Sequence, residues 1–370
     1  MYPLAFHLPN DYPFSKPSPL RDYLMRTLPK LLAGIFATGV FILIALAKPD
    51  GKPVEEKPPE LKFDEVKEIA PGVFFRYSSI SATDKSIPFG GSNHTWIVFK
   101  DYVVVIDANF PKEAGDVLAA IKKTTDKPIK YVLDTHHHGD HAYGNAVWAK
   151  AGAKIISSKN CERLLKTGGP MAWANASKDR KDVKDSELKL VDESFDEKFE
   201  LDDGTQRVEF YQLGHAHTSG DVVAYLPKHK ILCTGDACVN GAFNYMGHSN
   251  SGSWIKCLEK MEKFDVKLVC PGHGPITGKE LLAKQKRYFV DMREQIKKGI
   301  DAKKDLAAIT ASIDMPWYKE WTGKDAKEIK DNIEHVHKEL MGKIDHDRIG
   351  QLPNEGWPYA RTASDRLAGR

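Results

Sequence analysis

The clearest pattern along the chain is a series of short runs rich in β-branched and aromatic residues, separated by polar, glycine-rich or proline-rich segments. Runs of this length and composition are typical of β-strands that are buried on one or both faces. Strands are therefore expected at residues 73–78, 95–100, 102–107, 131–134, 154–158, 208–213, 222–226, 230–234 and 266–270.

Segments with the spacing of amphipathic helices lie between several of these runs. They cover residues 113–123, 142–150, 253–263 and 279–301, and a further helical pattern spans residues 324–343. Hairpin-like pairs of strands alternate with strand–helix–strand units, which indicates a layered α/β protein with mixed sheets.

One internal segment fits neither pattern. Residues 164–200 are polar, charged and only weakly periodic, so we expect an insertion or a long loop there. The apolar island within it, residues 168–176, contains Trp173 and is either a lid or a locally packed turn.

The N-terminal segment differs from the rest because residues 31–47 carry no charged side chain and basic residues precede them. The run is at the short end of the length that spans a bilayer, and its last residues, Ala45-Leu46-Ala47, resemble the end of a secretory signal. We therefore expect residues 1–47 to be a signal peptide or an N-terminal membrane anchor. Both interpretations export the remaining chain, as a periplasmic protein or one anchored in the membrane and facing the periplasm or the outside.

The rest of the chain divides by composition. Residues 48–60 are rich in proline, lysine and glutamate, which predicts a linker. We expect the main folded domain at residues 61–303, and a helical C-terminal extension with a loose tail at residues 304–370.

Charge and cysteine content exclude several classes of protein. The 54 Lys and Arg residues against 51 Asp and Glu residues leave a formal charge of +3, which is too small and dispersed for a nucleic-acid-binding surface. The five cysteines have no short paired spacing, so neither a disulfide framework nor a cysteine-type zinc ribbon is expected.

Histidine and aspartate residues follow four of the predicted strands. His136, His138, Asp140 and His141 follow the first of these strands, and the others are followed by His215 and His217, by Asp236, and by His273. Strand ends at one edge of a sheet present ligands and catalytic groups, so we expect the four loops to form one pocket.

The spacing within residues 136–141 indicates two metal half-sites. Alternate residues of an extended segment point the same way, so His136 and His138 can bind one ion while His137 points away. Asp140 and His141 lie where the loop turns into a helix and can face a second ion. Imidazole and carboxylate ligands suit zinc, manganese or iron, and the lack of cysteine here argues against a structural zinc.

With these residues in this order, the chain resembles the metallo-β-lactamase superfamily, whose H-x-H-x-D-H signature stands at residues 136–141. The G-x-A-H-T-x-G-D loop at residues 214–221, the pair Gly235-Asp236 and the loop at residues 271–274 follow in the family's order, and Asp107 is similar to its early structural aspartate. The resemblance covers residues 61–289, which includes most of the main domain, and implies a four-layer αββα sandwich with the site at one edge.

The same resemblance implies the metal ligands and the chemistry. One ion would be bound by His136, His138 and His217, the other by Asp140, His141 and His273, with Asp236 between them. The implied cofactors are two divalent ions, Zn²⁺ in first place and Fe or Mn as alternatives. Such a pair lowers the pKa of a shared water, so that a metal-bound hydroxide is available near neutral pH, and Asp140 and Asp236 would orient it. The expected enzyme is a binuclear metallo-hydrolase that acts on a small molecule.

The substrate class stays open because this fold carries several hydrolytic reactions. Our first expectation is a β-lactamase-like enzyme that cleaves an acyl, ester or amide-type bond. However, Asp236 stands where one lactamase subclass has cysteine, and Val239 where that subclass has a carboxylate-binding lysine, which favours a thioester hydrolase similar to glyoxalase II or another ester hydrolase. Two further alternatives are a mononuclear iron dioxygenase of sulfur compounds and a non-catalytic binding protein on the same fold.

Residues around the site are assigned by their position in the loops. Candidates for substrate contact are Asn244, Tyr245, His248 and Trp173. His137 and His215 are expected to lie behind the ligands or to face solvent, and Thr218 with Asp221 to support His217. The histidines in charged surroundings are expected at the surface; these are His229, His335, His337 and His346.

Overall fold

The computed structural model describes residues 58–78, 90–241, 244–318 and 326–349. Within these residues the strands form two sheets. The first sheet has the order β1 (Val66–Ala70), β2 (Val73–Arg76), β3 (His94–Val98), β4 (Val103–Ile106), β5 (Ile129–Leu133), β6 (Lys154–Ser158) and β7 (Glu193–Phe195). The second has the order β12 (Leu268–Pro271), β11 (Ile231–Gly235), β10 (Val223–Leu226), β9 (Arg207–Tyr211) and β8 (Lys198–Asp202).

Both sheets are mixed, as the sequence predicts. Strands β1 to β4 pair antiparallel, and β4 to β7 pair parallel through helical crossovers. In the second sheet β8 to β11 are antiparallel, and β11 and β12 are parallel with Cys233 opposite Cys270.

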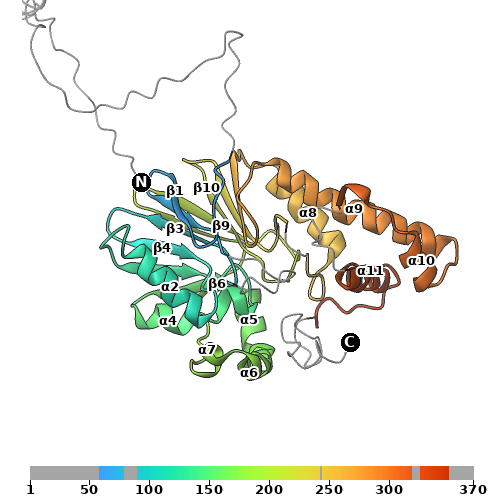
Figure 1. The fold of residues 1–370 in the computed structure, drawn as a ribbon, viewed down its shortest axis with the longest axis horizontal. Helices are drawn as coiled ribbons and strands as arrows, with labels where there is room; N and C mark the ends of the chain where they lie inside the picture. Colours follow the sequence, from blue (N-terminus) through green and yellow to red (C-terminus); the bar gives the residue numbers. More distant parts are fainter. Residues whose placement is uncertain (1–57, 79–89, 242–243, 319–325, 350–370) are drawn as a thin grey trace, which may run out of the picture. The chain divides into compact units, whose positions relative to one another are not determined.

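Helices cover the outer face of each sheet, which gives the four-layer αββα sandwich (Figure 1). The first sheet is covered by α2 (Pro111–Ile121), α4 (Asn145–Lys150) and α5 (Lys159–Thr167). The second is covered by α8 (Ser251–Met261) and α9 (Glu280–Asp301), with α10 (Leu306–Ser312), the 3-10 turn η1 (Pro316–Tyr318) and α11 (Ala326–Leu340) packed beside them.

Three hydrophobic clusters hold the layers together. The inner faces of the two sheets meet through side chains such as Phe75, Val104 and Phe210, all fully buried. Strand β4 reads Val-Val-Val-Ile with every residue buried, because one face meets the second sheet and the other meets the helices. The helix-side clusters are built around Trp148 on α4 and around Trp254 on α8.

The expectation of a loop at residues 164–200 is wrong. The segment contains the end of α5, α6 (Gly169–Asp179), α7 (Lys181–Lys184), β7 and most of β8. Ser158 is the N-cap of helix α5, because its hydroxyl accepts a hydrogen bond from the Cys161 amide at 3.1 Å. Of the buried residues of this helix, Cys161 precedes the predicted loop, whereas Leu164 and Leu165 fall within it. In β8, half-buried Phe199 and Leu201 alternate with exposed charged residues, a pattern hidden by the high charge of the segment.

The helix predicted at residues 142–150 is two short helices, α3 (Gly139–Ala142) and α4. The break at Gly144 has a steric cause. The Gly144 amide donates to the Asn109 carbonyl at 2.5 Å, and a Cβ atom at this position would lie 2.2 Å from the Ala108 carbonyl oxygen. The close approach of the loop after β4 therefore stops the helix and requires glycine.

The predicted C-terminal helix is confirmed as α11, although the segment shares the core of the main domain. Ile309, Tyr318 and Val336 are buried in the same cluster as Trp254 and Phe289. Helices α9 and α10 approach so closely that a Cβ atom on Gly299 would lie 2.5 Å from Ile309. The sandwich and residues 304–349 are thus joined by apolar packing.

Two predictions lie outside the described residues. These are the signal peptide or membrane anchor at residues 1–47 and the loose tail after residue 349, and most of the predicted linker at residues 48–60 lies outside them as well. Among the helices that are described, none has both the length and the apolar character needed to cross a bilayer.

The shared core predicts the effect of a substitution in α10. Replacing Ile309 with alanine should lower the free energy of unfolding by about 2–5 kcal/mol and shift one cooperative transition, because a fully buried side chain is removed. Chemical denaturation followed by fluorescence and circular dichroism measures this, with exposed Lys304→Ala as the control. A separate early transition, with the main one unchanged, would show that residues 304–349 fold independently.

Candidate metal centre

The chemically active side chains lie at the ends of four strands, as predicted. The loop after β5 and the start of α3 carry His136, His138, Asp140 and His141, whereas His217 lies between β9 and β10. Asp236 follows β11, and His273 follows β12. All seven side chains are buried or nearly so, and they lie within one cluster.

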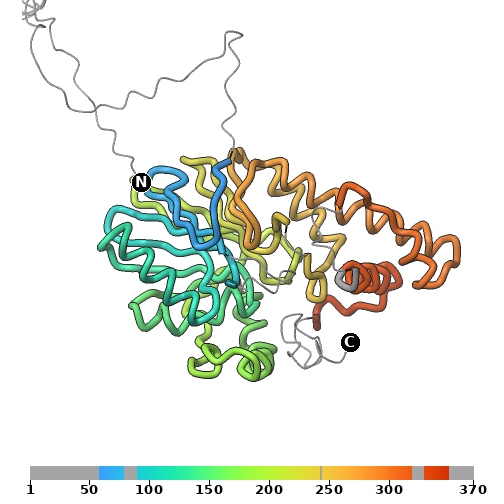
Figure 2. Tube along the Cα trace, viewed as in Figure 1, coloured from blue at the N-terminus to red at the C-terminus, as the bar shows by residue number. Residues whose placement is uncertain are grey.

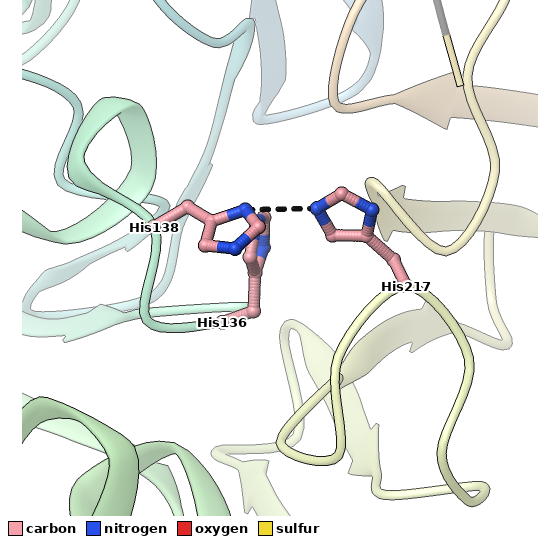
Figure 3. Close-up of side chains that lie close together, drawn as sticks. All are labelled: His136, His138 and His217. Atoms are coloured by element: carbon pink, nitrogen blue, oxygen red, sulfur yellow. Dashed lines mark hydrogen bonds between the residues drawn. The ribbon is translucent and has the colours of Figure 1, made fainter. Parts of the chain in front are cut away.

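Three histidines form the first half-site (Figure 3). His138 Nδ1 and His217 Nε2 face each other at 2.9 Å, and the His136 ring lies 4.6 and 4.8 Å from the His138 and His217 ring centres. The buried Nε2 atom of His136 has no hydrogen-bond partner among the described residues. Three converging imidazole nitrogens, one of them unpaired, are the donor set that a divalent ion such as zinc requires.

Two histidines and a carboxylate form the second half-site. His273 Nε2 lies 3.1 Å from Asp140 Oδ2 and 3.4 Å from His141 Nε2. Asp236 lies between the half-sites, because its carboxylate oxygens are 3.3 Å from His141 Nε2, 3.4 Å from His273 Nε2 and 3.6 Å from His217 Nε2. This is the placement that the sequence predicts for a bridging ligand.

The Asp236 and His273 loops are held together by the pairing of β11 and β12. The Gly272 amide donates to the Gly235 carbonyl at 2.9 Å. A Cβ atom on Gly272 would lie 2.2 Å from Asp236 Oδ1, so only glycine lets the two strand ends approach this closely.

Four of the histidines have their second ring nitrogen engaged by an outer partner. His141 Nδ1 donates to Asp107 Oδ2 at 2.9 Å, and His217 Nδ1 donates to the Tyr245 carbonyl at 3.0 Å. His136 Nδ1 lies 3.1 Å from Thr135 Oγ1, and His138 Nε2 lies 2.8 Å from His248 Nδ1. These bonds fix the ring orientation and leave the opposite nitrogen facing the cluster.

Asp107 supports the site as the sequence predicts. Its Oδ2 accepts from His141, and its Oδ1 accepts from the Thr135 amide at 2.8 Å, so one carboxylate ties β4 to the ligand loop. Its backbone is left-handed, with φ of 67°, which turns the chain sharply at the end of the strand.

The two half-sites differ in charge. Burial, reinforced by neighbouring histidines, holds the pKa of His136 and of His138 well below the usual range, and burial lowers the pKa of His217 to about 4. The first half-site is therefore a set of neutral imidazoles at neutral pH, ready to bind a cation.

The second half-site is a charged network. Burial would lower the pKa of His273, but Asp236 and Asp140 raise it to about 9. Burial is likewise outweighed at His141, where Asp107, Asp236 and Asp140 raise the pKa well above its ordinary value. The same contacts overcome the burial of Asp236 and hold its pKa well below normal. Two protonated histidines thus neutralise the carboxylates where a second cation would bind.

The structure separates the four predicted substrate contacts. Tyr245 and His248 lie beside the ligands, because the Tyr245 ring centre is 5.8 Å and the His248 ring centre 5.0 Å from that of His138. The Asn244 side chain donates to the Tyr318 hydroxyl at 2.7 Å, which turns it toward the C-terminal helices. Trp173 packs against Tyr143 in a small apolar cluster with Phe110, at a ring-centre distance of 4.8 Å.

His137, the expected non-ligand, is buried beside the first half-site. His137, His138 and His248 form a further group that could hold an ion, and His137 Nδ1 has no partner among the described residues. His138 presents Nε2 to this group, 2.8 Å from His248 Nδ1, and Nδ1 to the first half-site, 2.9 Å from His217 Nε2.

Of the other histidine predictions, the one for His215 is confirmed and the one for His335 is wrong. His215 lies behind the ligands as expected, with Nε2 2.8 Å from the His248 carbonyl oxygen. The surface assignment of His335 is wrong, since its side chain is 10% exposed and contacts Ser249 and Glu339. This contact joins segments 86 residues apart, so no local sequence pattern could indicate it.

Thr218 and Asp221 form the turn that carries His217. The Thr218 hydroxyl donates to Asp221 Oδ1 at 2.6 Å, and its amide donates to Oδ2 at 2.9 Å. Burial raises the pKa of Asp221 to about 7, although both Thr218 bonds oppose this rise. Their role behind the ligand is structural support of the loop.

The geometry is that of a candidate metal centre: a buried set of histidines and aspartates that could hold metal ions, at the edge of an αββα sandwich. A family model described as the metallo-beta-lactamase superfamily matches residues 87–273. The chain therefore belongs to the metallo-beta-lactamase superfamily.

Similar proteins agree with this assignment. The chain is 25% identical over 224 residues to the metallo-beta-lactamase type 2 of Elizabethkingia meningoseptica, an alignment that covers 59% of this chain and 80% of that protein. It is 26% identical over 200 residues to metallo-beta-lactamase IND-1 of Chryseobacterium indologenes, with 51% and 76% covered. A solved metallo-beta-lactamase from Pontibacter korlensis has the same fold, with a TM-score of 0.50, 23% identity and coverage of 61% and 98%.

The charge difference predicts proton release when the second half-site binds a cation. In the metal-free protein His273, with a pKa of about 9, and His141 are protonated at pH 7, so cation binding there should release about two protons and tighten as pH rises toward 9. The first half-site should release almost none, because its histidines are already neutral. Calorimetric titration in buffers of different ionisation enthalpy measures both, and identical heats in all buffers would contradict the prediction.

The Asp107 contact predicts a loss of affinity in a nearly isosteric variant. Asp107→Asn replaces the acceptor of the His141 Nδ1 proton with a neutral amide, so affinity at the second half-site should fall about 10–100-fold. Competition with a chromophoric chelator measures this. Exposed Asp101→Asn serves as the matched control, and equal affinities in the two variants would show that the Asp107 charge has no such role.

Proposed function

We propose that this protein is an exported binuclear metal-dependent hydrolase that cleaves an acyl, ester or amide-type bond in a small molecule. The observation that carries the proposal is the position of Asp236 within 3.6 Å of ligand nitrogens from both half-sites. A carboxylate in this position could contact an ion in each half-site. It therefore suits an enzyme in which two ions would act on the same water. Zn²⁺ is the ion most compatible with this donor set, and Fe or Mn are the alternatives.

The residues present fit such a pair of ions. When bound, two divalent ions supply a water of lowered pKa as nucleophile and polarise the bond to be cleaved. Asp140 and Asp236 remain ionised because the neighbouring histidines hold the pKa of both carboxyls down against the effect of burial, so both would accept hydrogen bonds from the water and orient it. Asp140 accepts from His273 through Oδ2, which fixes the orientation of its carboxylate.

Lactam hydrolysis is supported by the relatives, whose names describe metallo-beta-lactamases. A thioester or other ester substrate is the second candidate, and the residues near Asp236 favour it. Val239 is buried and its amide donates to Gln285 Oε1 at 2.9 Å, so this position offers no cation for a substrate carboxylate. Export is inferred from the apolar segment at residues 31–47, and cell fractionation tests it directly.

Asp140→Asn tests the mechanism. The variant should lose at least about 100-fold in turnover while its fold is unchanged, because the neutral amide replaces the charged carboxylate that would hold the second ion and orient the nucleophile. Metal content is measured first, followed by hydrolysis of nitrocefin and of thioester, lactone, phosphodiester and sulfate ester substrates. Exposed Asp116→Asn is the control.

Each contrary result points to a defined alternative. One iron per chain with oxidation of a sulfur compound would identify the dioxygenase. A protein that binds no divalent ion would be a non-catalytic member of the fold. Full turnover in Asp140→Asn would remove Asp140 from the reaction.

A further inference from the structure

The loop of residues 244–251, which leads into α8, supports the first half-site; we call it the support loop. The Tyr245 carbonyl accepts from His217, and the His248 ring bonds to His138. The Asn250 amide donates to the Ala216 carbonyl at 3.1 Å, next to His217. Two of the three histidines in this half-site therefore depend on one loop for their ring orientation.

The support loop is held from its other side by the C-terminal helices. Asn332 on α11 donates through Nδ2 to the Asn244 carbonyl at 2.7 Å and to the Tyr288 hydroxyl at 2.9 Å. The Asn244 side chain in turn donates to Tyr318. Figure 2 shows the red α11 beside the gold segment that leads into α8. The start of the loop is thus fastened to α9, η1 and α11.

The end of the support loop is fastened to the same helix. Glu339 Oε1 accepts from the Ser251 amide at 2.9 Å, and its other oxygen accepts from the Ser251 hydroxyl. Arg293 on α9 donates to the Ser251 hydroxyl at 2.6 Å and lies 3.3 Å from Glu339. His335 contacts the Ser249 carbonyl at 3.2 Å.

These contacts are buried, so breaking one of them leaves a polar group with neither a protein partner nor water. Asn244, Ser249, Ser251 and Asn332 are almost completely inaccessible, and the Glu339 side chain is 4% exposed. A buried carbonyl or amide that loses its partner cannot turn to water without moving the backbone. Between Asn244 and Asn250 the loop has no helix or strand to hold it, so these side-chain bonds add to the two backbone bonds made by the Ser249 and Asn250 amides.

We propose that α11 positions the first metal half-site: Asn332 and Glu339 fix the support loop, which fixes the rings of His138 and His217. This inference rests on the proposed metal-dependent function. Asn332 and Glu339 act through the loop and are positioning residues. Helix α11 lies outside the residues that the family model matches, so the role is specific to the C-terminal part of this chain.

The test uses the full-length protein with Glu339→Ala and Asn332→Ala, and with Glu334→Ala as the matched control. Glu334 is on the same helix but pairs with Lys338 at the surface. Hydrogen exchange of the metal-free protein should be faster at Ser251 in Glu339→Ala and at residues 244–246 in Asn332→Ala, and unchanged in the control. The first equivalent of Co²⁺, measured by chelator competition, should bind about 10–100-fold more weakly.

A conservative variant separates positioning from general stability. Glu339→Gln keeps an acceptor for the Ser251 amide, so it should recover most of the affinity. The second half-site should change less, because the outer partner of His141 is Asp107, directly after β4. The Co²⁺ spectrum of the first equivalent should shift in the Ala variants only.

The outcomes distinguish this inference from the proposed function. Exchange and affinity equal to those of Glu334→Ala would overturn the role of α11, even if the protein is an active hydrolase. Faster exchange with unchanged affinity would also overturn it. If the unaltered protein binds no ion, the proposed function fails, and the role in metal positioning fails with it.

Discussion

The burial of ionisable side chains at the strand ends is the constraint on which this structure depends. Removing an imidazole or a carboxylate from water is unfavourable unless it is paired, so each buried ligand requires a partner behind it. Asp107, Thr135, Tyr245 and His248 supply these partners from three segments, which are the end of β4, the loop after β5 and the support loop. The sandwich brings these segments together. In turn, each loop must keep the residue that bonds to a buried ligand.

The asymmetry between the half-sites follows from their partners. One contains neutral histidines whose outer contacts come from a carbonyl, a hydroxyl and another imidazole. The other is rich in carboxylates and retains protons on two histidines. A cation can bind at the first half-site without displacing protons, whereas binding at the second half-site displaces the protons of His141 and His273. The two positions are therefore expected to fill at different free concentrations of metal.

Local signals in the sequence were sufficient for a layered α/β protein with mixed sheets and for the gathering of histidines and aspartates at strand ends, and the resemblance to the superfamily supplied the four-layer sandwich. Strands buried on both faces are continuous apolar runs, and His136, His138, Asp140 and His141 lie within six positions. The sequence was insufficient for features whose position is determined by tertiary contacts. The half-buried strand β8 is masked by its charges, and the positions of Asn244 and His335 depend on helices far along the chain. Ligand roles remain predictions, although the geometry assembles them as expected.

The parallel pairing of β11 and β12 has a consequence for how the site can change. Cys233 lies opposite Cys270, but the register then shifts so that Gly235 lies opposite Pro271, and Asp236 and His273 follow these two strand ends. The two side chains therefore start from adjacent strand ends, about 4.8 Å apart, and their final separation also depends on this register shift and on the turn after β12. The support loop and the segment at residues 164–200 can gain or lose residues without altering this distance. Lengthening either strand by one residue would move one ligand to the opposite face of the sheet, so substrate range can diverge in this chain while the spacing of these two ligands stays constant.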